Sequence, residues 1–243
     1  MGLNFTKRLF ANIGGSEPFV QQLIGEMPTL VDAGMIDGAR REEVKHAILA
    51  ISFEGLMPAF EHLKRIRAAV GESVPELNRK QHYEDFAVAL WMAYKTLMPR
   101  ATELMDFNIG FLFQNDLNFD KGLVEFLKAL PPRGAQIGPY LRAQRTEWQN
   151  ELAEFRNFLQ HRSPGESRKY VGLYEPDYAE AVFERVWRTI AEIIALFISL
   201  RLWPGTSLVE IPAEERDPVR PRRFRFAVEG LNLPPPGKDD VPA

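Results

Sequence analysis

The chain has 243 residues, of which 45% are hydrophobic and 26% are charged, with a formal net charge of −3 at pH 7. This composition is typical of a globular protein, and the charge excludes a global attraction to polyanions, so any contact with nucleic acid requires a local basic patch. The absence of cysteine excludes disulfides, iron–sulfur clusters and cysteine nucleophiles, and leaves four histidines as imidazole ligands.

Apolar residues three or four positions apart recur along most of the chain, and this period predicts α-helices. The sequence therefore predicts an all-α fold, a helical bundle of about five to six helices with an irregular C-terminal tail. The helices are expected at residues 17–36, 41–70, 82–107, 119–130, 138–161 and 177–202. Pro28, Pro58 and Pro99 should kink or divide three of them, because proline lacks a helical N–H donor and clashes with the preceding turn.

The last predicted helix is apolar around almost its whole circumference beyond Ile193. Such a helix is buried either at the centre of its own bundle or against a second copy of the chain. After Trp203 the chain becomes rich in proline and arginine, although RFRFAV at 223–228 can form one short strand. We therefore expect a single helical domain over residues 1–203 and an irregular tail over 204–243.

No membrane segment is predicted. The most apolar run, IIALFISL at 193–200, is far too short to span a bilayer, and the N-terminus lacks the layout of a secretory signal. We therefore expect a cytoplasmic protein that does not contact a membrane.

Acidic residues gather at two places without the spacing of a metal site. One place resembles the opening of a calcium loop, but Lys121 and Leu127 occupy the positions that need glycine and glutamate. Its polar residues, which we expect to cap a helix, are Asp116, Asn118 and Asp120. The other is a stripe of three glutamates between 147 and 154, which no histidine joins at the spacing of a di-iron bundle. We expect neither a metal nor a cofactor.

The stretch EFRNFLQHRSPGE, residues 154–166, places basic and polar side chains at the end of a predicted helix. The apolar residues of that helix share one side, which should face the core: Trp148, Leu152, Phe155 and Leu159. Asn157 and His161 are four positions apart and lie near the opposite side, while Arg156 lies about 70° from the centre of the apolar stripe. The three polar residues should therefore point outward.

The run RNFLQH at 156–161 resembles the Arg-x4–6-His motif of the HEPN superfamily, small α-helical proteins that include many metal-independent RNases. The resemblance covers mainly residues 138–202. It implies a homodimer whose two motifs meet in a cleft, with Arg156 contacting the scissile phosphate, His161 exchanging protons and Asn157 orienting the pair. It also implies a toxin or defence effector, of a toxin–antitoxin or phage-defence kind, with a cognate antitoxin or regulatory protein as a partner.

The chemistry of these residue types suits RNA cleavage. RNA supplies its own nucleophile, the 2′-hydroxyl, so a protein need only move protons and stabilise negative charge in the transition state. Histidine titrates near neutral pH and can move the protons, while arginine stays charged and binds phosphate oxygens with two donors. No metal is then required, and DNA should resist cleavage because it lacks the 2′-hydroxyl.

Further basic residues surround the motif and could guide a phosphate backbone. The residues that we expect to bind RNA are Arg142, Arg145, Arg162, Arg168 and Lys169.

Other interpretations stay open. Arg156, His161 and Arg162 could be ordinary charges at a helix C-terminus, which favour the helix dipole. Arg41 and His46 have the same spacing, but glutamates follow that arginine at a predicted helix start, so we reject this pair as a motif. The main alternative to a nuclease is a non-catalytic module of the same ancestry that binds RNA, a nucleotide or a protein, and a third is a structural bundle without a site.

Overall fold

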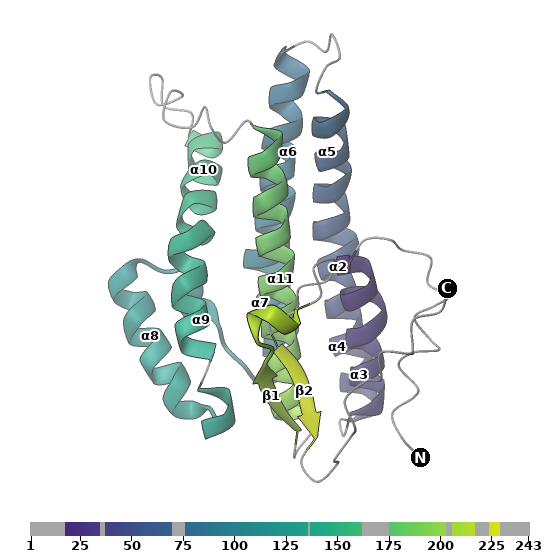
Figure 1. Ribbon diagram of the computed structural model, residues 1–243, viewed down its shortest axis with the longest axis vertical. Coiled ribbons are helices and arrows are strands. Elements are labelled where there is room, and N and C mark those ends of the chain that lie inside the picture. Colours follow the sequence, from purple (N-terminus) through teal and green to yellow (C-terminus); the bar gives the residue numbers. More distant parts are fainter. Residues whose placement is uncertain are drawn as a thin grey trace.

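Helices account for most of the residues that the computed structural model describes, which are 18–34, 37–69, 76–135, 137–161, 175–202, 206–216 and 224–228. The predicted all-α fold is confirmed, because these helices lie side by side as a bundle (Figure 1). The α-helices are α2 (Pro18–Val20), α3 (Met27–Ala33), α4 (Gly38–Ala50), α5 (Met57–Ala68), α6 (Glu76–Met92), α7 (Met98–Glu103), α8 (Asp116–Ala129), α9 (Ile137–Gln144), α10 (Asn150–His161) and α11 (Pro176–Arg201). Short 3-10 turns are η4 (Gly110–Phe113), η5 (Pro132–Gly134) and η8 (Ala213–Glu215).

Wide π-helical turns join several of these α-helices into longer continuous helices. The turns are η1 (Gln21–Glu26), η2 (Ile51–Leu56), η3 (Ala93–Leu97) and η6 (Arg145–Gln149). In each turn, the residue that follows donates its backbone N–H to the carbonyl five positions earlier, as Met57 does to Ser52. A π-turn holds one more residue than the corresponding α-helical turn.

Three of these turns explain how proline is accommodated inside a helix. The turns η1, η2 and η3 each end two residues before a proline, namely Pro28, Pro58 and Pro99. A proline ring clashes with the carbonyl four positions earlier, and in all three cases that carbonyl lies within the wide turn. The interruptions predicted at these prolines therefore take the form of wide turns, which keep the helix continuous.

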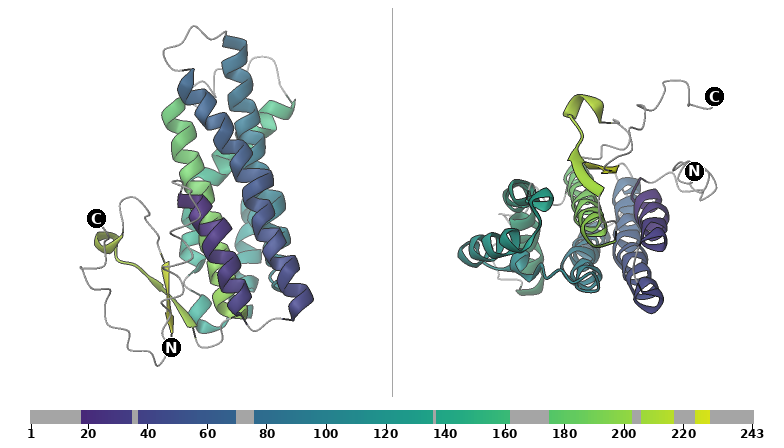
Figure 2. Two further views of the ribbon diagram at one scale, coloured as in Figure 1. Left: turned by 90° about the vertical axis from the view of Figure 1, so that its right-hand side faces the viewer. Right: turned by 90° about the horizontal axis from the view of Figure 1, so that it is seen from below.

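Helix α11 lies at the centre of the bundle. Figures 1 and 2 place α8, α9 and α10 on one side of it and α2 to α5 on the other. Every residue from Ile193 to Ser199 is buried, as predicted for a helix that is apolar around its circumference, and α11 contacts α3, α5 and α7. The sequence left two ways to bury this helix, inside its own bundle or against a second copy. In the structure its own bundle covers it. Among the described residues, no helix has both the length and the apolar character needed to cross a bilayer.

Gly55 allows two long helices to touch, namely the continuous helix α4–η2–α5 and the continuous helix α6–η3–α7. A Cβ atom at Gly55 would lie 2.5 Å from Ala93 Cβ and 2.8 Å from Ala93 Cα, so η2 and η3 approach each other backbone to backbone. Because Ala93 is fully buried, neither helix can move away without disturbing the core.

We expect Gly55→Ala to lower the free energy of unfolding by about 1–3 kcal/mol, because the added methyl group overpacks this contact. Gly38→Ala is the matched control, since a Cβ atom at Gly38 meets nothing within 4 Å. Urea unfolding followed by circular dichroism measures both variants. Equal stabilities for the two variants would contradict the close contact.

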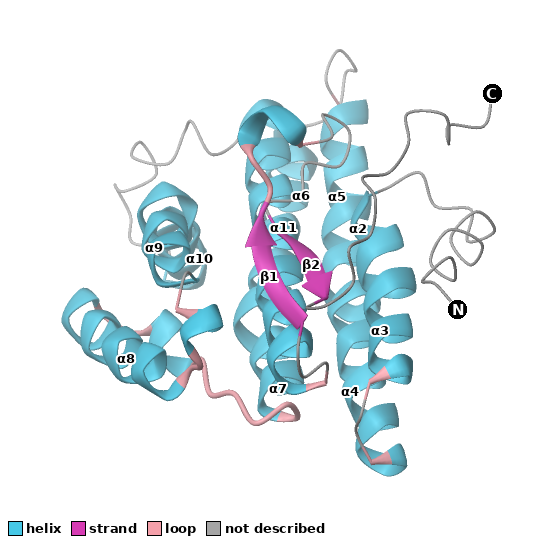
Figure 3. Ribbon diagram, turned by 60° about the horizontal axis from the view of Figure 1, so that its bottom comes forward, coloured by secondary structure: helices cyan, strands magenta, loops and turns pink. Residues whose placement is uncertain are grey.

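A two-stranded antiparallel sheet lies across α11 in the described part of the predicted tail (Figure 3). Strand β1 (Thr206–Glu210) pairs with β2 (Phe224–Val228), with Thr206 opposite Val228 and Glu210 opposite Phe224. The strand predicted within RFRFAV is confirmed as β2. Its partner β1 was not predicted.

Candidate functional site at the end of helix α10

The apolar side of α10 fixes how the motif residues are presented. Trp148, Leu152 and Phe155 are at most 2% exposed, so the stripe predicted from their spacing faces the core. The Trp148 ring packs edge-on against Tyr94 of η3, with 4.8 Å between the ring centroids. The continuous helix formed by η6 and α10 therefore cannot rotate about its axis without exposing a tryptophan, a leucine and a phenylalanine.

The motif residues Arg156 and Asn157 lie away from this buried stripe. Arg156 is half-buried, Asn157 is exposed, and Arg156 Nη1 donates a hydrogen bond of 3.3 Å to Asn157 Oδ1. His161 is the last residue of α10. Five positions along an α-helix correspond to about 140° of rotation and 7.5 Å of rise between Arg156 and His161. The side chain of His161, and the whole of Arg162, Arg168 and Lys169, lie outside the described residues.

Buried hydrogen bonds anchor the helix just before the motif. Trp148 Nε1 donates to Gln144 Oε1 (2.9 Å), and Tyr94 Oη donates to Gln149 Oε1 (2.9 Å). The amide of Gln149 in turn donates to the carbonyl of Leu112. Because these groups are buried, losing one partner leaves the other without a hydrogen bond, so the contacts tie η6 firmly to its neighbours.

Arg145 lies inside the protein, although the sequence predicts that it binds RNA. It is 7% exposed; its Nε atom donates to Asp116 Oδ1 (2.8 Å), and its Nη1 and Nη2 atoms donate to the carbonyls of Leu112 (3.2 Å) and Gln114 (2.7 Å). The guanidinium also lies over the ring of Phe119, 4.5 Å from its centroid. Arg145 therefore fastens α8 and the preceding segment to the motif helix.

Arg142 has a different environment from Arg145. Its guanidinium pairs with Asp120 of α8, but the side chains of both residues are about half exposed. An exposed ion pair of this kind contributes little to stability and exchanges readily. Arg142 therefore stays accessible to a phosphate group.

The residues considered for a calcium loop are part of helix α8. Asn115 caps this helix, because its side-chain oxygen accepts a 3.1 Å hydrogen bond from the backbone N–H of Asn118. The predicted capping role thus falls on Asn115, one position before Asp116, while Asp116 and Asp120 pair with the two arginines described above. Among the described residues, no group of three or more His, Cys, Asp or Glu could hold a metal ion.

Helix α6 carries a buried carboxylate, Glu84, which the sequence analysis did not single out. Glu84 is 7% exposed, and Lys80 Nζ lies 4.0 Å from its Oε1. Tyr94 is hydrogen-bonded to Gln149. Beyond this hydrogen bond, α6 and α10 lie antiparallel and in contact. Glu84 lies ten residues, or about 15 Å, from Tyr94, at the level of the last turn of α10. In the sequence, the sign of its burial is that Glu84 lies among the apolar residues Tyr83, Ala87 and Trp91, which are all buried in the structure.

The chain stands apart in comparisons with known proteins. No family model matches it, and neither a curated protein nor a solved structure does.

Proposed function

We propose that the protein is a metal-independent endoribonuclease whose active site is formed by Arg156, Asn157 and His161. The observation that carries the proposal is the orientation of α10, which buries Leu152 and Phe155 together with Trp148 of η6, and leaves Arg156 half-buried and Asn157 exposed. A guanidinium and an amide that only completed the core would be covered instead.

The proposed reaction uses the 2′-hydroxyl of RNA as the nucleophile. Its oxygen attacks the adjacent phosphorus while its proton is removed, the P–O5′ bond breaks, and a proton is delivered to the leaving 5′-oxygen. The products are a 2′,3′-cyclic phosphate and a 5′-hydroxyl. In this scheme His161 exchanges the protons, and Arg156 binds the phosphate oxygens as their negative charge grows.

The hydrogen bond from Arg156 to Asn157 supports a positioning role for the amide. It uses one guanidinium nitrogen, and within the described part of the chain the other donors of Arg156 have no partner, so they can bind a phosphate.

A second copy of the chain would complete the proposed site. Arg156 and His161 differ by about 140° around the helix axis, so a single phosphate between them needs a further surface. A two-fold dimer provides such a surface, because each motif then meets the same motif of its partner. We expect light scattering at micromolar concentration to give the mass of a dimer, and a monomer would contradict the shared cleft.

The experiment that tests the proposal is incubation of the purified chain with single-stranded RNA in excess EDTA. We expect cleavage that leaves 2′,3′-cyclic phosphate ends, and no cleavage of the same sequence carrying 2′-O-methyl groups, because that strand has no nucleophile. Mass spectrometry of the products identifies the ends. Binding without cleavage would overturn catalysis in favour of the non-catalytic module, and neither binding nor cleavage would overturn both.

A nuclease of this kind would damage its own cell if it were always active. We propose that it serves as a toxin or defence effector, restrained by a cognate antitoxin or another regulatory protein.

A further inference from the structure

Two histidine rings meet between α5 and α6, which lie side by side in the bundle (Figures 1 and 2). His62 of α5 and His82 of α6 lie with 5.8 Å between their ring centroids and 43° between their planes. Both residues are half-buried. The rings are therefore part of the contact that holds the two helices together.

One nitrogen of each ring is closed off from water and from hydrogen bonds. The Nδ1 atoms of His62 and His82 are buried, and neither has a hydrogen-bond partner in the described part of the chain. A neutral imidazole tolerates this arrangement, because its single N–H can be carried by Nε2. An imidazolium carries an N–H on both nitrogens, so its Nδ1–H would be buried without an acceptor, which is costly. The packing therefore favours the neutral form of both rings.

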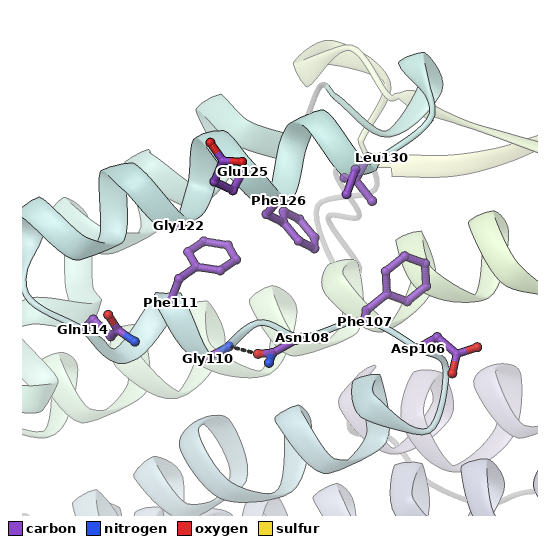
Figure 4. A pocket seen from close by; sticks show the side chains of 11 residues that line it. Asp106, Phe107, Asn108, Gly110, Phe111, Gln114, Gly122, Glu125, Phe126 and Leu130 are labelled. Carbon is purple, nitrogen blue, oxygen red and sulfur yellow. Dashed lines mark hydrogen bonds between the residues drawn. The ribbon is translucent and has the colours of Figure 1, made fainter.

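Other polar groups near the surface have partners, as the pocket between α8 and the segment joining α7 to α8 illustrates (Figure 4). The side-chain oxygen of Asn108 accepts a 2.9 Å hydrogen bond from the N–H of Gly110. Asp106 pairs with two arginines (2.5 Å each), and Glu125 pairs with Lys128 (2.9 Å). The two histidines differ from these groups because their inner nitrogens are left unpaired.

The environment of His62 also opposes a positive charge on its ring. Burial is the largest influence and lowers the pKa of this histidine. Among the described charges that face it, Asp85 of α6 raises the pKa and His82 lowers it, while Arg65 of α5 lowers the pKa and Glu61 raises it. The charges thus oppose one another, and they do not compensate for the burial.

We propose that His62 and His82 form an acid-sensitive clasp between α5 and α6. Above about pH 6.5 both rings are neutral and pack together, whereas in acid each gains a proton, a buried N–H without an acceptor and a cationic neighbour. The clasp goes beyond the proposed nuclease function and does not depend on it, because neither histidine belongs to the motif of α10.

The direction of the pH effect follows from proton linkage. A histidine that is released from the contact takes up a proton near its ordinary pKa of about 6.5. The packed ring of His62 takes up a proton only at lower pH, because its pKa is lowered. The closed contact therefore keeps its full stability above about pH 6.5 and loses stability as the pH falls below that value.

The test is hydrogen exchange of the native chain, followed by NMR at about pH 8 and about pH 5.5 with EDTA to keep metal ions off the imidazoles. We expect the protection factors of the α5 and α6 amides near the two rings to fall at least about threefold in acid, since one linked proton changes an opening equilibrium by up to about tenfold per pH unit. Protection in the central helix α11 should fall less. Equal protection of α5 and α6 at both pH values, or equal loosening of α11, would overturn the clasp.

The His62→Phe variant keeps a ring of similar size that cannot take up a proton. We expect its α5 and α6 amides to be equally protected at both pH values. The control is His46→Phe, which changes an exposed histidine of α4 and should keep the native response to acid. Acid opening that persists in His62→Phe would overturn the proposal. A second measurement needs no variant: NMR titration of His62 in the native chain should give a pKa below the ordinary value of about 6.5, and a pKa above it would overturn the clasp.

Discussion

The His161→Ala variant is expected to cleave RNA about 10²- to 10⁴-fold more slowly than the native chain, the usual effect of losing a general acid or base. His161 is the last residue of α10, and the buried side chains of Trp148, Leu152 and Phe155 precede it in the chain. The measurement is the initial rate of cleavage of a labelled RNA in EDTA. Circular dichroism and urea unfolding should show that the variant remains folded.

The second histidine at motif spacing provides the matched control. His46 follows Arg41 by five positions on α4 and is exposed. We expect His46→Ala to cleave RNA at the native rate, because we assign no role to this pair. Loss of cleavage in His46→Ala alone would move the site to α4, and native rates in both variants would exclude both histidines from catalysis.

The Arg145→Lys variant is expected to lose about 2–4 kcal/mol of unfolding free energy. A lysine ammonium cannot reproduce the fork that reaches Asp116 and the carbonyls of Leu112 and Gln114 together. Losing hydrogen bonds of a buried charged group costs about 1–3 kcal/mol, although the carbonyl of Leu112 keeps its donor from Gln149. The contact of the guanidinium with the Phe119 ring is lost as well. Urea unfolding followed by tryptophan fluorescence measures the change.

Arg142→Lys is the control for this variant, because Arg142 lies one turn earlier and also pairs with a carboxylate of α8. This pair is about half exposed, and we expect a change within about 0.5 kcal/mol. Equal destabilisation of the two variants would contradict the structural role of Arg145. RNA binding measured on the folded fraction of each variant then tests, separately from stability, whether either arginine contacts RNA.

Much of the fold follows from sequence periodicity, because burial on one side leaves a clear pattern in a long helix. The predicted stretch 138–161 is helical from Ile137 to His161, and Trp148, Leu152 and Phe155 of the predicted stripe are buried. The start of α6 was placed six residues too late, at 82 instead of Glu76, because its first turns alternate charged and polar residues and carry little apolar signal.

Features that depend on contacts between distant segments could not be predicted. The turn η6 contains no proline to mark it, and strand β1 is five residues long, with its pairing partner fourteen or more residues away. The sequence places Arg145 with the other basic residues near the motif, but its burial depends on carbonyls more than thirty positions earlier. Spacing alone therefore identified the outward face of α10, while the role of Arg145 and the burial of Glu84 required the packed bundle.

The π-turn before the motif has a consequence for how the length of this protein can change. A π-turn contains one residue more than an α-helical turn, so it can lose a residue and become α-helical. The helical segments on either side then keep the same residues turned toward the core. In η6 the exposed Thr146 and Glu147 are the positions where such a deletion would disturb the interior least. A related chain that lacks one residue there can still present the counterparts of Arg156 and Asn157 on the same side of α10. The motif therefore tolerates a one-residue deletion in η6, although the helix around it is tightly packed.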